Sequence, residues 1–450
     1  MNRRQFLSTG AAVPAAAPLA APTARAASQP PNVLLILFDK CRTDAIGAYD
    51  ERPVHTPHID QLARSGVRFA NCYTPQALCG PARASILTGA YPHTHGLRRN
   101  VYPYDPSRLN SNYPEFVPDP FRDPRFRLWD NFPFLLNNAG YATGYIGKWH
   151  LGPANPGFFD YWKGFNSGLR HWIGEPHNSR YRPDVHTDEA VRFVERADQP
   201  FFLCVSHYSP HEPLDPPRQY LERYQGMDAE HACYYGSVTN LDANVGRLVE
   251  ALDRKKLLDD TLVVLTTEHG RTWRPRPGTA EGMCVAYEES SRIPLIVRYP
   301  SRFPAGMVWQ SGVSLVDLMP TILATCNVNP HTGAPPAHHG QDLAGLVRSG
   351  EDRWTRPLVM QNLPQHGIDG SYYDERALRT ERYKLILRKF DARPEFRPGE
   401  LYDMTADRVE TRNLYTASRD TVRTLALELA AWGRAHGDSV AERLGEAAAA

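Results

Sequence analysis

Three short, mainly apolar runs of six residues constrain the fold of this chain most, because each is followed directly by polar residues. They are residues 33–38 (VLLILF), 201–206 (FFLCVS) and 262–267 (LVVLTT). A continuous run of this length is typical of a strand buried on both faces of a parallel sheet. Helical stretches, such as 187–196 and 232–256, lie between the runs. Strands that alternate with helices predict an α/β fold with a large mixed, mostly parallel sheet flanked by helices.

Polar side chains follow each of these runs. Asp39 comes directly after the first run, Glu268 and His269 after the last, and the middle run leads to His207 and His211. The carboxyl ends of parallel strands meet at one edge of a sheet, where ligands bind in α/β folds. We therefore expect an active site at this edge.

From about residue 350 the pattern changes to short strands. Residues 377–380 and 383–387 are predicted to be antiparallel strands, and 421–436 to be a terminal helix followed by an Ala-rich end. We expect a catalytic domain over 30–345 and a smaller C-terminal antiparallel-sheet α+β subdomain over 350–450.

The first 26 residues have the pattern of an export signal. Arg3 and Arg4 precede a mildly apolar, Ala-rich stretch, and small residues at 24–26 offer a cleavage site. The stretch is too short and too weakly apolar to span a bilayer. We expect a twin-arginine signal peptide over 1–26, with a disordered tail as the alternative, and a periplasmic or secreted mature protein without a membrane span.

Charge and cysteine content argue against two other classes. The 51 Lys and Arg residues nearly balance 50 Asp and Glu residues, so we expect no binding to nucleic acid. Seven cysteines are present, but none forms the close CxxC pair of a zinc or redox motif.

Cys79 stands apart from the other cysteines because it opens the run Cys-Gly-Pro-Ala-Arg. Pro81 suits the first turn of a helix, which places Cys79 at the helix N-terminus, where free N–H groups favour an anion. Arg83 falls one turn along the same face and can reach the Cys79 side chain. A capped helix with a surface arginine is the alternative, because the motif alone is weak.

In order and context the chain resembles the type I, formylglycine-dependent sulfatases of the alkaline phosphatase superfamily. The resemblance runs from about residue 32 to 414 and includes the Cys-x-Pro-x-Arg motif followed by Thr-Gly. Further blocks in family order are GKWHLG at 147–152, PHEP at 210–213, EHG at 268–270 and ELYD at 400–403. The resemblance implies an alkaline-phosphatase-like fold and a maturation enzyme that oxidises Cys79 to formylglycine.

By the same resemblance, Asp39, modified Cys79, Glu268 and His269 are the ligands of one divalent cation. In the family this ion is Ca²⁺ or Mg²⁺, and a histidine ligand also admits Mn²⁺. A hydrated aldehyde at position 79 supplies two hydroxyl groups. One attacks the sulfur of a sulfate ester, and the other then loses its proton to expel sulfate and regenerate the aldehyde.

The resemblance implies four further catalytic residues. Arg83 and Lys148 hold the diol and the sulfate, His150 assists the diol proton, and His211 lies near the leaving group. The alternatives are a surface cation for Lys148, a core histidine for His150 and a loop-shaping role for His211.

Three residues depart from the family pattern. Lys40 stands where many members have a second acidic ligand, so it must point away from the ion or weaken the site. Glu268 stands where Asp is usual and is one methylene longer. Met283 stands at the place of a second catalytic lysine, which leaves His211 to protonate the leaving group more alone. An arginine at 271, 274 or 276 would replace the charge but is a poor acid.

The variable segments are rich in Arg, His, Trp and Tyr, as in RHW at 170–172, RYR at 180–182 and WR at 273–274. Such a rim suits an anionic sugar, which favours a sulfated carbohydrate as substrate, although solvated loop arginines explain it equally well. Two other functions stay open. One is a phosphonate or phosphate-ester hydrolase with the same nucleophile, and the other is a degenerate sulfated-glycan binder, suggested by Lys40 and Met283.

Overall fold

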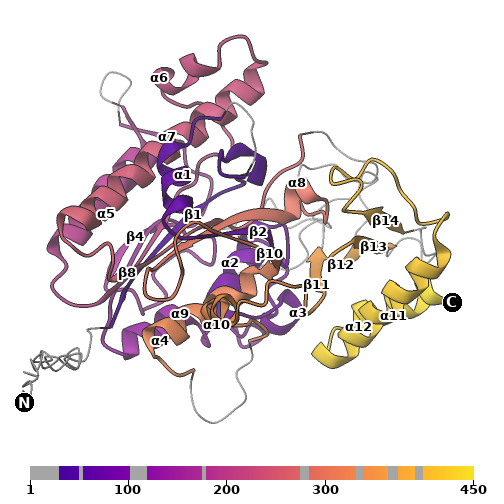
Figure 1. The fold of residues 1–450 in the computed structure, drawn as a ribbon. Helices are drawn as coiled ribbons and strands as arrows, with labels where there is room; N and C mark the ends of the chain where they lie inside the picture. Colours follow the sequence, from indigo (N-terminus) through magenta and orange to yellow (C-terminus); the bar gives the residue numbers. More distant parts are fainter. Residues whose placement is uncertain are drawn as a thin grey trace, which may run out of the picture. The chain divides into compact units, whose positions relative to one another are not determined.

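An eight-stranded sheet carries most of the chain, in the order β10-β2-β9-β8-β1-β7-β3-β4 (Figure 1). Its strands are β1 (Asn32–Phe38), β2 (Val67–Tyr73), β3 (Ala142–Lys148), β4 (Tyr161–Phe165), β7 (Phe201–Ser206), β8 (Thr261–Thr267), β9 (Arg292–Arg298) and β10 (Met307–Ser314). Every pairing is parallel except the two that β9 makes, with β2 and β8. The predicted mixed, mostly parallel sheet is therefore confirmed.

The computed structural model describes residues 30–49, 54–101, 119–174, 179–273, 283–330, 338–362, 373–390 and 399–450. The predicted signal peptide lies outside these residues. The chain from Pro31 to Ala450 forms one compact unit, and its division into 30–345 and 350–450 stays a prediction. Among the described residues, no helix combines the length and apolar character needed to cross a membrane.

Helices cover both faces of the large sheet (Figure 1). One face carries α1 (Pro57–Arg64), α5 (Arg182–Arg196) and α7 (Ala229–Arg254). The other carries α2 (Cys79–Thr88), α4 (Phe132–Asn138), α9 (Leu318–Cys326) and α10 (Leu343–Ser349). Alternate residues of β1 enter the two cores, Leu35 on the α2 side and Ile36 on the α7 side. Two buried faces explain why the strand is apolar from Val33 to Phe38.

A second, four-stranded antiparallel sheet follows in the C-terminal part. It consists of β11 (Leu358–Asn362), β12 (Tyr373–Arg379), β13 (Tyr383–Phe390) and β14 (Glu400–Asp403). The predicted terminal helix is α11 (Arg419–His436), and the Ala-rich end forms a further helix, α12 (Ser439–Ala449), which packs on it. A Cβ at Gly445 would lie 2.3 Å from the Ala426 carbonyl oxygen, so this close packing requires glycine.

Short elements complete the described fold. They are α3 (Pro92–His95), α6 (Arg218–Leu221), α8 (Glu288–Ser291), β5 (Trp172–Ile173), β6 (Arg180–Tyr181) and three 3₁₀ turns (Thr43–Ala45, Glu222–Tyr224 and Leu315–Asp317).

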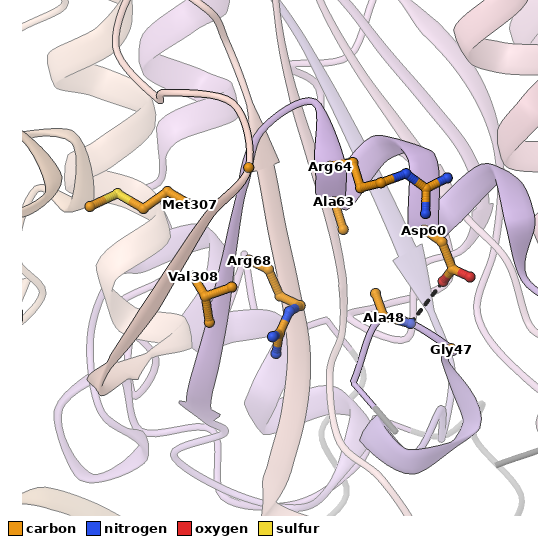
Figure 2. Close-up of a pocket in the computed structure, with 9 residues that line it drawn as sticks. Gly47, Ala48, Asp60, Ala63, Arg64, Arg68, Met307 and Val308 are labelled. Carbon is orange, nitrogen blue, oxygen red and sulfur yellow. Dashed lines mark hydrogen bonds between the residues drawn. The ribbon is translucent and has the colours of Figure 1, made fainter. Parts of the chain in front are cut away.

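A surface cavity of about 220 Å³ lies where β2 and β10 begin (Figure 2). Asp60, Arg64 and Arg68 line it together with the start of β10. Because β2 and β10 run in the same direction as β8, their first residues lie at the edge opposite the ends of β1 and β8. None of the predicted site residues lines this cavity.

Candidate active site

The predicted polar residues converge at the carboxyl edge of the large sheet. In the parallel pairings of β1, Phe38 lies opposite Thr267 and Leu37 opposite Ser206, so Asp39 and Glu268 leave the sheet at the same level. Lys148 is the last residue of β3, one strand beyond β7. The register of four neighbouring strands thus brings together side chains that are far apart in the sequence.

Four potential metal ligands meet at this edge. One ligand atom from each of Asp39, Cys79, Glu268 and His269 lies within 4.8 Å of all the others, and all four residues are buried. Cys79 Sγ is 3.2 Å from His269 Nε2 and 3.9 Å from Asp39 Oδ1. His269 Nδ1 lies 2.7 Å from the Gly270 carbonyl oxygen, which can only accept a hydrogen bond. In the neutral ring Nε2 therefore keeps a lone pair for a metal ion.

The two carboxylates of this group differ in their surroundings. Glu268 Oε2 is buried and has no hydrogen-bond partner among the described residues. Burial raises the pKa of Glu268, although Arg83 opposes the change. Burial acts in the same direction on Asp39, but the charge of Lys148 and of other nearby cations holds its pKa well below the usual range. The site thus contains a buried carboxylate oxygen that has no hydrogen-bond partner among the described residues, and a bound cation would satisfy it.

Lys148 is fully buried and donates a hydrogen bond to Asp39 Oδ2. Its ammonium group also lies 4.9 Å from the centre of the Tyr208 ring. Because Lys148 is buried, the surface-cation interpretation is wrong. A buried ammonium ion is stable only where charged and polar groups contact it, as Asp39 does here.

Arg83 is buried and crosses the site from α2 to the strand ends. Nη1 donates to the Lys148 carbonyl oxygen at 2.6 Å and to Ser206 Oγ at 2.7 Å. Nη2 lies 3.2 Å from Glu268 Oε1 and 3.7 Å from Asp39 Oδ2. The surface-arginine alternative is wrong, because Arg83 is buried. Within the described part of the chain its hydrogen bonds go to β3, to the end of β7 and to Glu268, and not to the Cys79 thiol.

Both predicted histidines adjoin the site. His150 follows β3, is buried and has a φ of 57°, a left-handed conformation that is rare for a residue with a side chain. Burial, together with the charges of Lys148 and Arg83, lowers its pKa well below the usual value. His211 is partly exposed, stacks on Tyr208 with ring centres 4.5 Å apart and donates from Nδ1 to the Glu212 carbonyl oxygen at 2.8 Å. Burial lowers its pKa as well, so the ring is neutral at pH 7.

The three departures from the family pattern have different outcomes. Lys40 Nζ binds Glu212 Oε2 at 2.9 Å, so its charge is paired with a carboxylate outside the ligand group. Glu268, despite its extra methylene, places one carboxylate oxygen with the other three potential ligands and also pairs with Arg83. Met283 is partly buried. Of the candidate replacement arginines, Arg271 binds Glu212 and Glu230, whereas 274 and 276 lie outside the described residues.

Several residues of the site were not predicted from the sequence. Ser206 and Tyr145 share the Lys148 carbonyl oxygen and contact Arg83, and Asn100 Oδ1 accepts a hydrogen bond from Gly80 N at 2.7 Å. Ser206 ends an apolar run, so the rule that selects Asp39 also applies to it. Tyr145 and Asn100 carry no comparable signal.

The predicted cationic rim is largely occupied by internal contacts. Arg180 pairs with Asp188 at 2.5 Å, and Arg182 Nε donates to the Arg170 carbonyl oxygen at 2.7 Å. Trp172 Nε1 donates to the Asp215 carbonyl oxygen at 2.9 Å. These side chains therefore have structural partners, and they do not by themselves indicate a glycan.

The fold and the site define an α/β protein with a buried group of potential metal ligands next to two buried cations, an arrangement suited to binding an anionic ester. The sulfatase family model matches residues 31–328, and a model described as N-sulphoglucosamine sulphohydrolase, C-terminal, matches residues 283–431. The chain therefore belongs to the sulfatase family of the alkaline phosphatase superfamily and is an enzyme that hydrolyses sulfate esters.

Known relatives and structures agree with this assignment. An ulvan-active sulfatase from Formosa agariphila is 27% identical over 429 residues, which cover 85% of this chain and 77% of that protein. N-acetylgalactosamine-6-sulfatase from Sus scrofa is 29% identical over 350 residues, which cover 68% of this chain and 64% of that protein. The crystal structure of yidJ from Bacteroides fragilis has a TM-score of 0.76 at 25% identity and covers 94% of this chain and 100% of its own.

Proposed function

We propose that the protein removes sulfate from a sulfated carbohydrate, with residue 79 oxidised to formylglycine and one divalent cation bound beside it. The observation that carries this proposal is the meeting of Asp39, Cys79, Glu268 and His269 within 4.8 Å at the start of α2. Two buried cations, Arg83 and Lys148, contact the carboxylates of the same group.

The residues present fit a hard divalent cation. Two carboxylates, one of them with an oxygen that has no partner in the described part of the chain, offer the oxygen ligands that Ca²⁺ and Mg²⁺ prefer. His269 Nε2, which faces residue 79, carries the lone pair of the ring and also suits Mn²⁺. When bound, the cation neutralises charge on the sulfate and lowers the pKa of an oxygen nucleophile at position 79.

The chain's own side chains then account for substrate binding and proton transfer. Arg83 and Lys148 are held by buried partners, so they offer fixed positive charge to the sulfuryl oxygens without reorganisation. His211 Nδ1 donates a hydrogen bond to the Glu212 carbonyl oxygen. Nε2 is therefore the ring nitrogen that accepts a proton and passes it to the leaving group. The negative charge of a bound sulfate ester raises the pKa of His211 and favours its acidic form.

A carbohydrate substrate is supported by the names of relatives. The Formosa protein is named for ulvan, and the porcine protein for N-acetylgalactosamine 6-sulfate. Both names describe sulfated sugars, although the two relatives differ in the sugar.

Maturation and turnover test the proposal together. The chain is produced with a formylglycine-generating enzyme, and the peptide containing residue 79 is analysed by mass spectrometry. We expect an aldehyde at residue 79, release of sulfate from an aryl sulfate and from sulfated oligosaccharides, and loss of turnover in Cys79→Ala. An untouched thiol in active protein contradicts the proposal, and so does a thousandfold preference for a matched aryl phosphonate.

We further propose export through residues 1–26, supported by the Arg3-Arg4 pair ahead of the Ala-rich stretch. N-terminal sequencing of protein secreted by the native host is expected to begin after residue 26. A mature protein that retains Arg3 and Arg4 contradicts export by this route.

A further inference from the structure

Lys40 places a positive charge directly after a predicted metal ligand. It follows Asp39 at the end of β1 and has a φ of 59°. The residue is only 8% exposed, so solvent does little to screen its ammonium group. An unbalanced cation here opposes the binding of a divalent ion.

Glu212 supplies the balancing charge. Its Oε2 accepts a hydrogen bond from Lys40 Nζ at 2.9 Å, and its Oε1 lies 2.8 Å from Arg271 Nη1. Its backbone carbonyl oxygen accepts the Nδ1 hydrogen of His211 at 2.8 Å. Glu212, in the segment that follows β7, therefore contacts both Lys40 and His211, the predicted leaving-group histidine.

The charges inside the site show why this pairing matters. In the ionised form that binds a cation, Asp39 and Glu268 carry two negative charges, which the buried Lys148 and Arg83 already match. Lys40 would make the surroundings of the ligand group positive, unless a further carboxylate holds it. Glu212 is the carboxylate that contacts Lys40 among the described residues.

We propose that Glu212 is a positioning residue that holds the Lys40 ammonium group away from the ligand group and so permits a divalent cation to bind there. This inference rests on the proposed function, because it takes Asp39, residue 79, Glu268 and His269 as the ligands. It explains how a sulfatase site tolerates a lysine where many relatives have a second acid.

The test measures Ca²⁺ binding to the matured full-length protein by calorimetry. We expect Glu212→Gln to weaken Ca²⁺ binding about 10- to 100-fold, the range typical of residues that support metal ligands. The double variant Lys40→Gln/Glu212→Gln is expected to regain wild-type affinity, because it removes the charge that Glu212 balances. Glu230→Gln, which removes the other partner of Arg271 and does not contact Lys40, is the matched control and should bind Ca²⁺ normally.

Two results overturn the inference: Glu212→Gln with wild-type affinity, or a double variant that binds as weakly as Glu212→Gln. Lys40→Gln alone provides a second test if Glu212→Gln does not fold. Its Ca²⁺ affinity should equal or exceed that of the wild type, and a tenfold loss contradicts the inference. Sulfate release from the same preparations tests the proposed function separately. A protein that binds Ca²⁺ as expected but releases no sulfate contradicts the proposed function and leaves the role of Glu212 in place.

Discussion

At the scale of single residues, Lys148 combines features that are rarely found together in a lysine. It is fully buried, its ammonium group contacts Asp39, and it faces the ring of Tyr208. Such a fixed cation stabilises negative charge that develops during a reaction, because nothing has to reorganise around it.

We therefore expect Lys148→Met to lower kcat on an aryl sulfate by about 100- to 1,000-fold, the usual cost of losing one fixed donor to a developing charge. Ca²⁺ affinity should stay the same or increase, because the substitution removes a positive charge next to Asp39. Lys163→Met, an exposed lysine of β4, is the control for loss of a lysine. A kcat within tenfold of the wild type, or a loss of Ca²⁺ binding, contradicts this role.

The sequence predicts part of this site because some residues have positional signals. Asp39 and Glu268 each follow a buried, mainly apolar strand, and that position alone indicates the functional edge of a parallel sheet. Tyr145 and Tyr208 have no such signal, because a tyrosine near a strand end is equally typical of a core. The partner of Lys40 was also not predictable, since Glu212 lies 172 positions away and only the fold brings the two together.

At the scale of elements, the contact between α7 and the start of α1 contains a buried acid. Asp242 of α7 accepts a hydrogen bond from Ile59 N at 2.8 Å, and only 2% of the residue is exposed. Burial raises the pKa of Asp242 from its usual 3.8 to about 7, although the bonds from α1 oppose the change. The folded protein therefore holds a proton here that the unfolded chain releases at a lower pH.

This difference has a definite sign. Between pH 3.8 and about 7 the Asp242 carboxyl is protonated more in the folded state than in the unfolded state. Its contribution to the free energy of unfolding therefore falls as the pH rises through this range. Its greatest effect is about 1.4 kcal/mol per pH unit. We expect the free energy of unfolding of Asp242→Asn, measured by urea denaturation, to exceed that of the wild type at pH 8. The difference should be smaller at pH 5, where Asp242 is neutral in the folded protein. Asp253→Asn, at an exposed position of the same helix, is the control for loss of an acid, and equal slopes in Asp242→Asn and wild type contradict the argument.

Elements differ in how well their sequences predict them. The strands β1, β7 and β8 are apolar because both faces are buried, and their predicted bounds agree with the structure to within one residue. By contrast, β9 contains Pro294, and β2 shifts register against it between Phe69 and Cys72, where the ladder is irregular. The helix α12 was not predicted, although its buried residues Ala441, Leu444, Gly445 and Ala448 recur at helical spacing, and glycine at 445 permits the close approach to α11.

At the scale of the whole molecule, a buried ion cluster connects the C-terminal sheet to the segment before β9. Lys384 of β13 is fully buried, and its Nζ lies 2.6 Å from Glu288 Oε1 and 2.7 Å from Glu410 Oε1. It also donates to the Ala286 carbonyl oxygen at 2.8 Å. Glu288 is the first residue of α8, which directly precedes β9 of the large sheet. The Lys384 ammonium group therefore connects the four-stranded sheet to the segment that leads into the eight-stranded sheet.

We expect Lys384→Met to lower the free energy of unfolding by about 3–5 kcal/mol, because the two acids then lose their buried partner. Loss of this joint should also separate the unfolding of the two sheets, so that a single urea transition becomes two. The control is Lys389→Met, at an exposed position of the same strand, which keeps the cluster intact and should unfold like the wild type. An unfolding free energy that changes by less than about 0.5 kcal/mol, the usual range for a surface substitution, contradicts the prediction. In that case the two sheets are held together by apolar packing, such as that of Tyr73 and Tyr287 against Ile386, and not by the buried charges.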